Sequence, residues 1–245
     1  MRWEVDGKKY TRPELWGGVN RGSVRVHSKE VYDVGKMERS EAVLITIDVE
    51  HIPTGVSLWP AFWTTFTGAN IPPRAGTNPV WPTFGEIDII ETWNDDTTIQ
   101  STLHTTGETW SKANSHLATN QTRSKCSMSG VDRGKHPQTG APADGSGNCD
   151  VAATGNAGCG VTGPADTHGR AFNDQKGGVF AMEWSVLGEA ADAHIAMWYW
   201  PREEWTRQGG ADKMFGSSPD PAVSPTLSLI PAPRSPGLRA SKVSG

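Results

Sequence analysis

The sequence predicts an all-β fold, because short segments that alternate apolar and polar residues are separated by turn-rich stretches. Its 28 glycines and 17 prolines suit a chain with many turns. At 245 residues, the chain is long enough for one sizeable all-β domain or two small ones, and none of its apolar stretches is long enough to span a bilayer.

The first two predicted strands come before residue 50. In Gly22–Ser28, Val24 and Val26 alternate with basic residues, and Ala42–Val49 places a branched apolar residue at every second position. Both patterns predict half-buried strands. Residues 1–20 lack clear periodicity and are interpreted as an irregular lead-in, with one edge strand as an open alternative.

A central strand is predicted at Val56–Phe66, after a turn at His51–Gly55. It carries apolar residues on both faces, and Pro60 argues against a helix interior. Trp59 and Trp63 share a face of this strand. One of them is expected to line a substrate cleft and the other to pack, and their spacing does not decide which.

A Pro-rich loop at 67–82, a candidate cleft wall, leads into residues 85–91, Gly-Glu-Ile-Asp-Ile-Ile-Glu. Side chains alternate faces in a strand, so Glu86 and Asp88 point one way and the isoleucines between them point into a core. Counting by twos puts Glu91 on the apolar face, where an unpaired charge is costly. A bulge of one extra residue would return Glu91 to the face of the other acids and leave two isoleucines for the core.

Three acids on one exposed strand face repel one another, so they are not expected to titrate alike. Retaining glycosidases use such an arrangement: one ionised carboxylate attacks the sugar, and a protonated one, about 5 to 5.5 Å away, donates to the leaving oxygen. A Ca²⁺ site or a merely solvated strand face is the alternative. It is disfavoured because metal loops need turn glycines and carbonyl oxygens, so no metal is expected in this β-branched run.

The next predicted strand, Thr98–Thr105, returns antiparallel to the carboxylate strand after a short turn at 92–97. Its polar side chains Gln100, Thr102 and His104 share one face, and we expect this row beside the three acids as the floor of a cleft. His104 could be an ordinary, partly exposed strand histidine. Beside carboxylates, its expected role is hydrogen bonding within the cluster and not base chemistry.

The stretch 107–170 is rich in Ser, Thr, Gly, Ala and Asn and contains all three cysteines, Cys126, Cys149 and Cys159. The last two enclose a short Gly-rich loop that a disulfide could close, although three pairings are possible and an odd count leaves one cysteine over. The spacing of the cysteines and nearby histidines does not match a zinc site.

The last predicted strand pair is Val179–Trp184 and His194–Trp200, with both tryptophans of the second strand on one face. The chain beyond Glu204 is polar and Pro-rich and cannot form a core. The sequence therefore predicts a domain at residues 1–205 and a disordered Pro/Ser/Gly-rich tail at 206–245.

The carboxylate run, with Gly85 before it and with Trp59–Trp63 upstream, resembles the catalytic signature of glycoside hydrolase family 16. It is similar to the fungal-type, laminarinase-like endo-β-1,3(4)-glucanases of that family. Further motifs resemble the family pattern in order, over about residues 20–202: Ser23–Val26, His51–Gly55, Thr102–Thr105, Asn148–Asp150, Gly158–Gly160 and Gly178–Trp184.

The resemblance implies a β-sandwich of the jelly-roll type (concanavalin A-like) and an endo-acting retaining hydrolase of β-1,3- or mixed β-1,3/1,4-glucans, without a cofactor. It further implies Glu86 as the nucleophile, Glu91 as the acid/base and Asp88 as the residue assisting between them. The two-residue gap between Asp88 and Glu91 resembles the bulged branch of the family. The expected substrate-binding residues are Trp59, Trp63, Trp93, Asn94, Gln100, His104 and Trp184.

Nothing beyond about residue 202 resembles the last strands of the family, so we expect a C-terminally truncated sandwich. Two other functions stay open: a non-catalytic β-glucan-binding protein on the same fold, and a family 16 galactan hydrolase or transglycosylase. The first is expected to have lost one or both glutamates, and the second differs in its loops.

Charge and tryptophan content favour a neutral polysaccharide as partner. The formal net charge is −4 and no run of Lys or Arg stands out, so nucleic acid and anionic membranes are not expected partners. The 11 tryptophans offer flat apolar rings that can stack on a pyranose. The first residues hold no signal-peptide-like run, yet the cysteines, the sequon Asn120–Thr122 and the resemblance favour an extracellular protein, which we expect to be a monomer.

Overall fold

The computed structural model describes residues 3–5, 8–10, 24–28, 42–65, 81–82, 85–107, 140–143, 147–185, 194–210 and 227–229. The chain divides into two compact units, Met1–Glu30 and Val31–Gly245. The predicted boundary at residue 205 stays a prediction, since most of the tail beyond it lies outside the described residues.

In the first unit, β1 (Trp3–Val5) pairs antiparallel with β2 (Lys8–Tyr10). The strand predicted at Gly22–Ser28 is wrong for its described part, which has no regular structure and leaves Val24 and Val26 92% and 88% exposed. Alternation favours a strand only where a neighbour bonds its backbone and covers one face. None of the described strands pairs with this segment.

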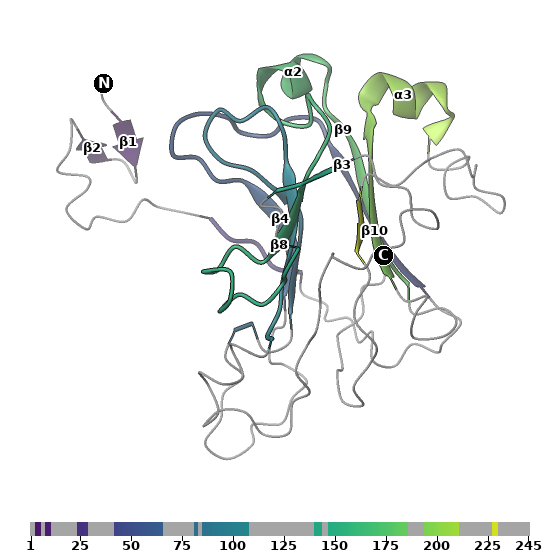
Figure 1. The fold of residues 1–245 in the computed structure, drawn as a ribbon. Coiled ribbons are helices and arrows are strands. Elements are labelled where there is room, and N and C mark those ends of the chain that lie inside the picture. Colours follow the sequence, from purple (N-terminus) through teal and green to yellow (C-terminus); the bar gives the residue numbers. More distant parts are fainter. Residues whose placement is uncertain are drawn as a thin grey trace. The chain divides into compact units, whose positions relative to one another are not determined.

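The second unit is a sandwich of two antiparallel sheets, which stand side by side in Figure 1. Among the described residues, one sheet has the order β11-β10-β9-β3 and the other has the order β4-β5-β6-β8-β7. The predicted all-β sandwich is therefore confirmed. The strands are β3 (Ala42–Val49), β4 (Ala61–Thr65), β5 (Glu86–Glu91), β6 (Gln100–His104), β7 (Ala141–Pro142), β8 (Cys159–Thr162), β9 (Gly178–Ser185), β10 (His194–Pro201) and β11 (Leu227–Leu229).

The hydrophobic core lies between these two sheets. It joins the isoleucines of β5 to Phe180 and Met182 of β9, both of which are buried. The alternating row of β3 packs against the same core through Ile45, Ile47 and Val49, as its pattern predicted. The core covers one face of the sheet that contains β5 and β6. The polar side chains of these two strands therefore lie on the opposite face of that sheet.

Two short helices, α2 (Gly169–Asp174) and α3 (Arg202–Arg207), lie at the same end of the sandwich (Figure 1). Helix α2 inserts the fully buried Phe172 into the core. Helix α3 places Trp205 against Trp200 on the outer face of β10, with ring centroids 5.4 Å apart, and both tryptophans of β10 share this face as predicted. In the part of the chain that the structure describes, no helix is long and apolar enough to cross a membrane.

Strand β4 is shorter than the predicted strand Val56–Phe66, because the residues before Ala61 form a loop. The backbone of this loop is bonded elsewhere: Leu58 N–H donates to the Gly55 carbonyl, and the Leu58 carbonyl accepts from Asn94 N–H. Other predictions lie outside the described residues, namely most of the loop 67–82, the stretch 108–139 with its sequon, and most of the lead-in and the tail.

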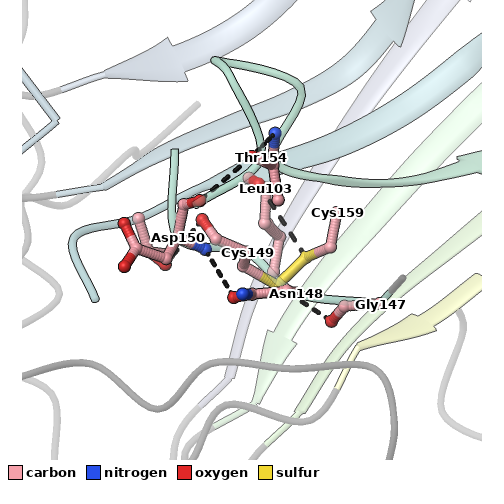
Figure 2. Close-up of a disulfide and its surroundings, with 9 residues drawn as sticks. Leu103, Gly147, Asn148, Cys149, Asp150, Thr154 and Cys159 are labelled. Atoms are coloured by element: carbon pink, nitrogen blue, oxygen red, sulfur yellow. Dashed lines mark hydrogen bonds between the residues drawn. A yellow bond between two sulfur atoms is a disulfide. The ribbon is translucent and has the colours of Figure 1, made fainter. Parts of the chain in front are cut away.

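A disulfide joins Cys149 to Cys159 and closes the loop between them (Figure 2). It is one of the three pairings that the sequence left open. Cys159 is the first residue of β8 and pairs with Leu103 of β6. The disulfide therefore holds this loop next to β6, the strand beside the carboxylate strand β5. Cys126 lies outside the described residues, and with three cysteines in the chain it has no intramolecular disulfide partner left.

Replacing Cys149 and Cys159 by alanine should lower the free energy of unfolding by about 2 to 3 kcal/mol, because the cross-link limits the unfolded chain. Urea denaturation of both proteins measures the difference. In the unfolded, unreduced chain we expect one reactive thiol per molecule, which the control Cys126→Ser removes. Zero thiols in the unmutated monomer, or two thiols left after Cys126→Ser, would contradict the pairing.

Candidate functional site

The three carboxylates of β5 share one face because a bulge interrupts the strand. The register between β5 and β6 pairs Glu86 with His104, Asp88 with Thr102, and Glu91 with Gln100. These β6 partners are two residues apart along an unbroken strand, so they share a face and the three acids lie opposite them. The register shifts between Asp88 and Glu91, and the predicted bulge and polar row are therefore confirmed.

All three isoleucines of β5 are buried in the core. The predicted bulge had placed only two of them there. Ile87, Ile89 and Ile90 are 7%, 2% and 4% exposed. The bulge sets Ile89 and Ile90 of β5 against a single residue of β6, so both stay on the apolar side. Each buried side chain contributes about 1.5 to 3 kcal/mol of transfer free energy, which fixes the carboxylates on the opposite face.

Asp88 and His104 form a buried pair within the acid row. Asp88 Oδ2 lies 3.0 Å from His104 Nε2, and both residues are buried. Burial alone would lower the pKa of His104, but the contact with Asp88 and the charges of Glu86 and Glu91 outweigh it and raise the pKa. The ring contacts the acid row through Asp88, which agrees with the hydrogen-bonding role expected from the sequence.

Glu86, Asp88 and His104 are also the group of described residues whose donor atoms could hold a metal ion, with all these atoms within 4.8 Å of one another. Within this group, Asp88 Oδ2 and His104 Nε2 contact each other at 3.0 Å. We therefore interpret the group as an ion-pair cluster.

Each glutamate accepts a hydrogen bond from a tryptophan. Trp81 Nε1 donates to Glu86 Oε2 at 3.1 Å, and Trp59 Nε1 donates to Glu91 Oε1 at 2.8 Å. Trp81 also lies against the His104 ring, with centroids 5.7 Å apart. Sequence reasoning included Trp59 but missed Trp81, whose signal was an aromatic residue at the end of the Pro-rich loop, directly before the carboxylate strand.

The pKa values of Glu86 and Glu91 are both raised. Burial is the largest cause, and the charge of Asp88 adds to it, whereas the indole hydrogen bonds and His104 act in the opposite direction. A raised pKa helps a carboxylic acid to keep its proton near neutral pH. Because both shifts have the same sign, the pKa values do not distinguish the two glutamates.

The loop that carries Trp59 is tied to the turn after β5. Asn94 N–H donates to the Leu58 carbonyl at 3.0 Å, and Ser57 N–H donates to the side-chain oxygen of Asn94 at 2.8 Å. Asn94 has a left-handed φ of 57°, which asparagine tolerates in a turn. Asn94 was expected to bind substrate, and in this structure its side chain holds the loop of Trp59.

His168, which the sequence did not single out, joins three segments below this loop and is fully buried. Its Nδ1 lies 2.6 Å from the Asp96 carbonyl oxygen and 3.1 Å from the Thr92 hydroxyl, and its Nε2 lies 3.2 Å from the Pro53 carbonyl oxygen. The turn after β5 and the loop before β4 are thereby held together.

A cavity of about 230 Å³ lies beside Glu91. Trp93 and Gln100, both expected to bind substrate, line it, and Trp93 lies against Trp59 with ring centroids 5.9 Å apart. An aromatic wall beside polar side chains suits a sugar ring. The other lining residues are Thr92, Asp96, Thr98, Ile99 and Thr162.

Trp63 joins the carboxylates and Trp184 does not. Trp63 lies opposite Asp88 in the β4–β5 register, so it shares the face of the acids. Trp59 also lies at this face, because its indole bonds Glu91. The expectation that one of these two tryptophans packs away from the cleft is therefore wrong. The expected substrate contact of Trp184 also needs correction: alternation in β9 places it with Phe180, partly buried against the core.

The disulfide loop packs against His104. Gly158, at φ +62°, approaches β6 so closely that a Cβ would stand 2.3 Å from the Leu103 carbonyl oxygen and 3.0 Å from His104 Nδ1. The loop is braced by Thr154, whose hydroxyl donates to the Asp150 carbonyl at 3.0 Å and accepts from Gly158 N–H at 2.9 Å (Figure 2). Buried His104 Nδ1 finds no hydrogen-bond partner in the described chain, so packing holds this side of the ring.

Comparisons with known proteins agree with this geometry. A family model described as "XgeA-like, catalytic GH16 domain" matches residues 4–208. The endo-1,3(4)-beta-glucanase xgeA of Emericella nidulans is 32% identical over 186 residues, which are 76% of this chain and 22% of that protein. The chain thus spans about a fifth of the length of this curated relative.

Two solved structures are similar. Laminarinase 16A from Phanerochaete chrysosporium, with β-glucans in its donor and acceptor sites, is 29% identical with a TM-score of 0.54, over 87% of this chain and 56% of that one. An elongating GH family 16 β-1,3-glucosyltransferase is 28% identical with a TM-score of 0.52, over 80% and 51%. The expected jelly-roll sandwich is confirmed.

Gly158→Ala should destabilise the protein more than Gly155→Ala, its matched control in the same loop. Gly155 has φ +61° but nothing within 4 Å of an added Cβ, so alanine there meets only backbone strain of about 1 to 2 kcal/mol. At Gly158, overpacking against the Leu103 carbonyl adds about 1 to 3 kcal/mol. Urea unfolding gives both values, and equal losses in the two variants would refute the contact with β6.

Proposed function

The chain belongs to glycoside hydrolase family 16, and from that premise we propose that its β5–β6 face hydrolyses β-1,3- or mixed β-1,3/1,4-glucans internally, with retention of configuration. The observation that carries the proposal is the bulge, which sets Glu86, Asp88 and Glu91 in one row opposite the polar side chains of β6. A retaining mechanism needs two carboxylates on the same side of one sugar, about 5 to 5.5 Å apart.

In the first step, an ionised Glu86 attacks the anomeric carbon. The bond from that carbon to the leaving glycosidic oxygen breaks, and Glu91 transfers its proton to this oxygen. The raised pKa of Glu91 supports its role as the proton donor. The hydrogen bond from Trp81 and the nearby His104 limit the rise in the pKa of Glu86, and its role as the nucleophile follows from its position in the motif.

In the second step, the glycosyl ester on Glu86 is hydrolysed. Glu91, now ionised, takes a proton from a water molecule, whose oxygen attacks the anomeric carbon while Glu86 leaves. Trp59 donates to Glu91 at 2.8 Å and so stabilises the ionised form that this step needs. Asp88, paired with His104, supports both steps from its place between the glutamates.

The substrate class follows from the neighbours of the carboxylates and from the relatives. Trp59, Trp63 and Trp81 surround the acids, and such rings bind neutral pyranoses through their apolar faces. The relative from Emericella nidulans is named an endo-1,3(4)-beta-glucanase, and the Phanerochaete structure holds β-glucans. Digestion of laminarin, lichenan, agarose and xyloglucan, with products resolved by size, tests this choice.

Glucosyl transfer is the second candidate, because one similar structure is an elongating β-1,3-glucosyltransferase. The same glycosyl ester would then pass to the hydroxyl of a second glucan instead of to water. Products longer than the starting oligosaccharide would identify transfer, and shorter products alone would identify hydrolysis. A chain that binds laminarin but cleaves none of the four polysaccharides would identify a binding protein.

We also propose an extracellular location. The Cys149–Cys159 disulfide supports it, because structural disulfides persist in oxidising compartments.

The two glutamates should respond differently to removal. Glu86→Ala abolishes cleavage of every substrate, because no glycosyl ester can form. Glu91→Ala abolishes cleavage of laminarin but largely spares the first step on an aryl glycoside, whose good leaving group needs little protonation. Added azide should then give a β-glycosyl azide with the Glu91 variant, measured by NMR of the product.

Asp88→Asn is the comparison variant and should weaken both steps without abolishing either. A glycosyl azide formed by the Glu86 variant would exchange the two roles. An inverted product from the unmutated chain would rule out the double displacement.

The indole hydrogen bonds should appear in the pH profile. Trp59→Phe removes a donor that lowers the pKa of Glu91, so that pKa rises and the alkaline limb of kcat/KM, where the acid loses its proton, moves to higher pH. Trp81→Phe raises the pKa of Glu86, so the acidic limb, where the nucleophile gains a proton, moves to higher pH.

Each variant is the control for the other, because each removes one indole hydrogen bond, and the two bonds go to different glutamates. Movement of either limb to lower pH, or of the same limb in both variants, would contradict these contacts.

A further inference from the structure

Ser101 occupies a position where its neighbours on the strand are apolar. It lies between Ile99 and Leu103 in alternation, so it faces the core, and it is only 6% exposed. A buried hydroxyl is expected to have a hydrogen-bond partner. The partner of Ser101 is the backbone: its Oγ donates to the carbonyl oxygen of Ile89 at 2.8 Å.

Ser101 and Ile89 are the residues that the strand registers leave out. Between β5 and β6, no partner stands opposite Ser101, and Ile89 has no partner on either β4 or β6. The hydroxyl therefore bonds the residue inserted by the bulge. Ser101 itself is anchored from the other side, because it pairs with Val161 of β8.

The bulge competes with a regular ladder. If the pairing of Asp88 with Thr102 continued without an extra residue, Ile89 would lie opposite Ser101 and Glu91 would lie opposite Ile99. Glu91 would then turn toward the core and leave the face of Glu86. In the bulged arrangement, the hydrogen bond from Ser101 Oγ to the Ile89 carbonyl satisfies a buried backbone acceptor.

We propose that Ser101 is a positioning residue of this site: its hydroxyl holds the β5 bulge in the arrangement that keeps Glu91 beside Glu86. The inference rests on the proposed function of Glu91 as the proton donor. It assigns a task to a core residue that touches neither the substrate nor a carboxylate.

The test compares Ser101→Val with Ser101→Thr. The two new side chains have nearly the same shape, but threonine keeps the hydroxyl and valine has a methyl group in its place. Misplacing an acid by about 1 Å costs up to about 100-fold. In the valine variant, kcat/KM on laminarin should fall by about 10-fold to 100-fold. On a dinitrophenyl laminarioligoside, which needs no proton donor, it should stay within about twofold.

The ratio of the two kcat/KM values is independent of the fraction of folded protein, because both assays use the same preparation. Ser101→Thr should keep the unmutated ratio. Thr105→Val is the control, since it removes a hydroxyl bonded to the Cys149 carbonyl at 2.9 Å, at the end of β6 and away from the bulge. A ratio unchanged in Ser101→Val, or lowered equally in Ser101→Thr, overturns the proposal.

A second readout needs no activity. The Trp59 indole proton, assigned with Trp59→Phe, reports the position of Glu91 through its 2.8 Å hydrogen bond, and the Trp81 indole reports Glu86 on the other side of the bulge. In Ser101→Val the Trp59 resonance should move toward that of a free indole while the Trp81 resonance stays. No shift overturns the proposal, whereas an unmutated chain that cleaves neither substrate overturns the proposed function instead.

Discussion

The structure of this site depends on one constraint, which is that a single strand must face a hydrophobic core and an acid row at the same time. A regular strand with the sequence of β5 would bury Glu91 or expose an isoleucine. The bulge at Ile89 removes the conflict, since all three isoleucines are buried and the three acids lie opposite the polar row of β6. Burial of apolar area thereby places the three acids on the opposite face.

The acid row is stabilised by groups of two kinds. Asp88, at its centre and buried, pairs with His104, whose pKa its neighbours raise. The outer acids receive indole N–H groups instead, which bond a carboxylate without adding charge. Partial burial raises the pKa of both glutamates, and the neutral indole donors limit that rise.

Two aromatic side chains of the site, Trp59 and Trp93, come from loops, and local hydrogen bonds tie these loops together. Asn94 ties the loop of Trp59 to the turn after β5, and His168 joins the same turn to the loop before β4. The disulfide loop packs Gly158 against His104 from the other side. The rigid sheets supply the carboxylates, while the loops anchored in this way supply part of the surroundings.

The sequence by itself determined the strands β3 and β5, the acid row, its bulge and the polar row ending at His104, because alternation of side chains along a strand is a local property. Tertiary structure alone decided which strand faces pack together. That is why the sequence misjudged the exposed segment at Val24 and expected Trp184, which is partly buried against the core, at the substrate. The contacts of Trp81 and Ser101 also needed the structure, since each depends on a partner brought close by folding: Trp81 bonds Glu86, and Ser101 bonds a carbonyl 12 residues away across the bulge.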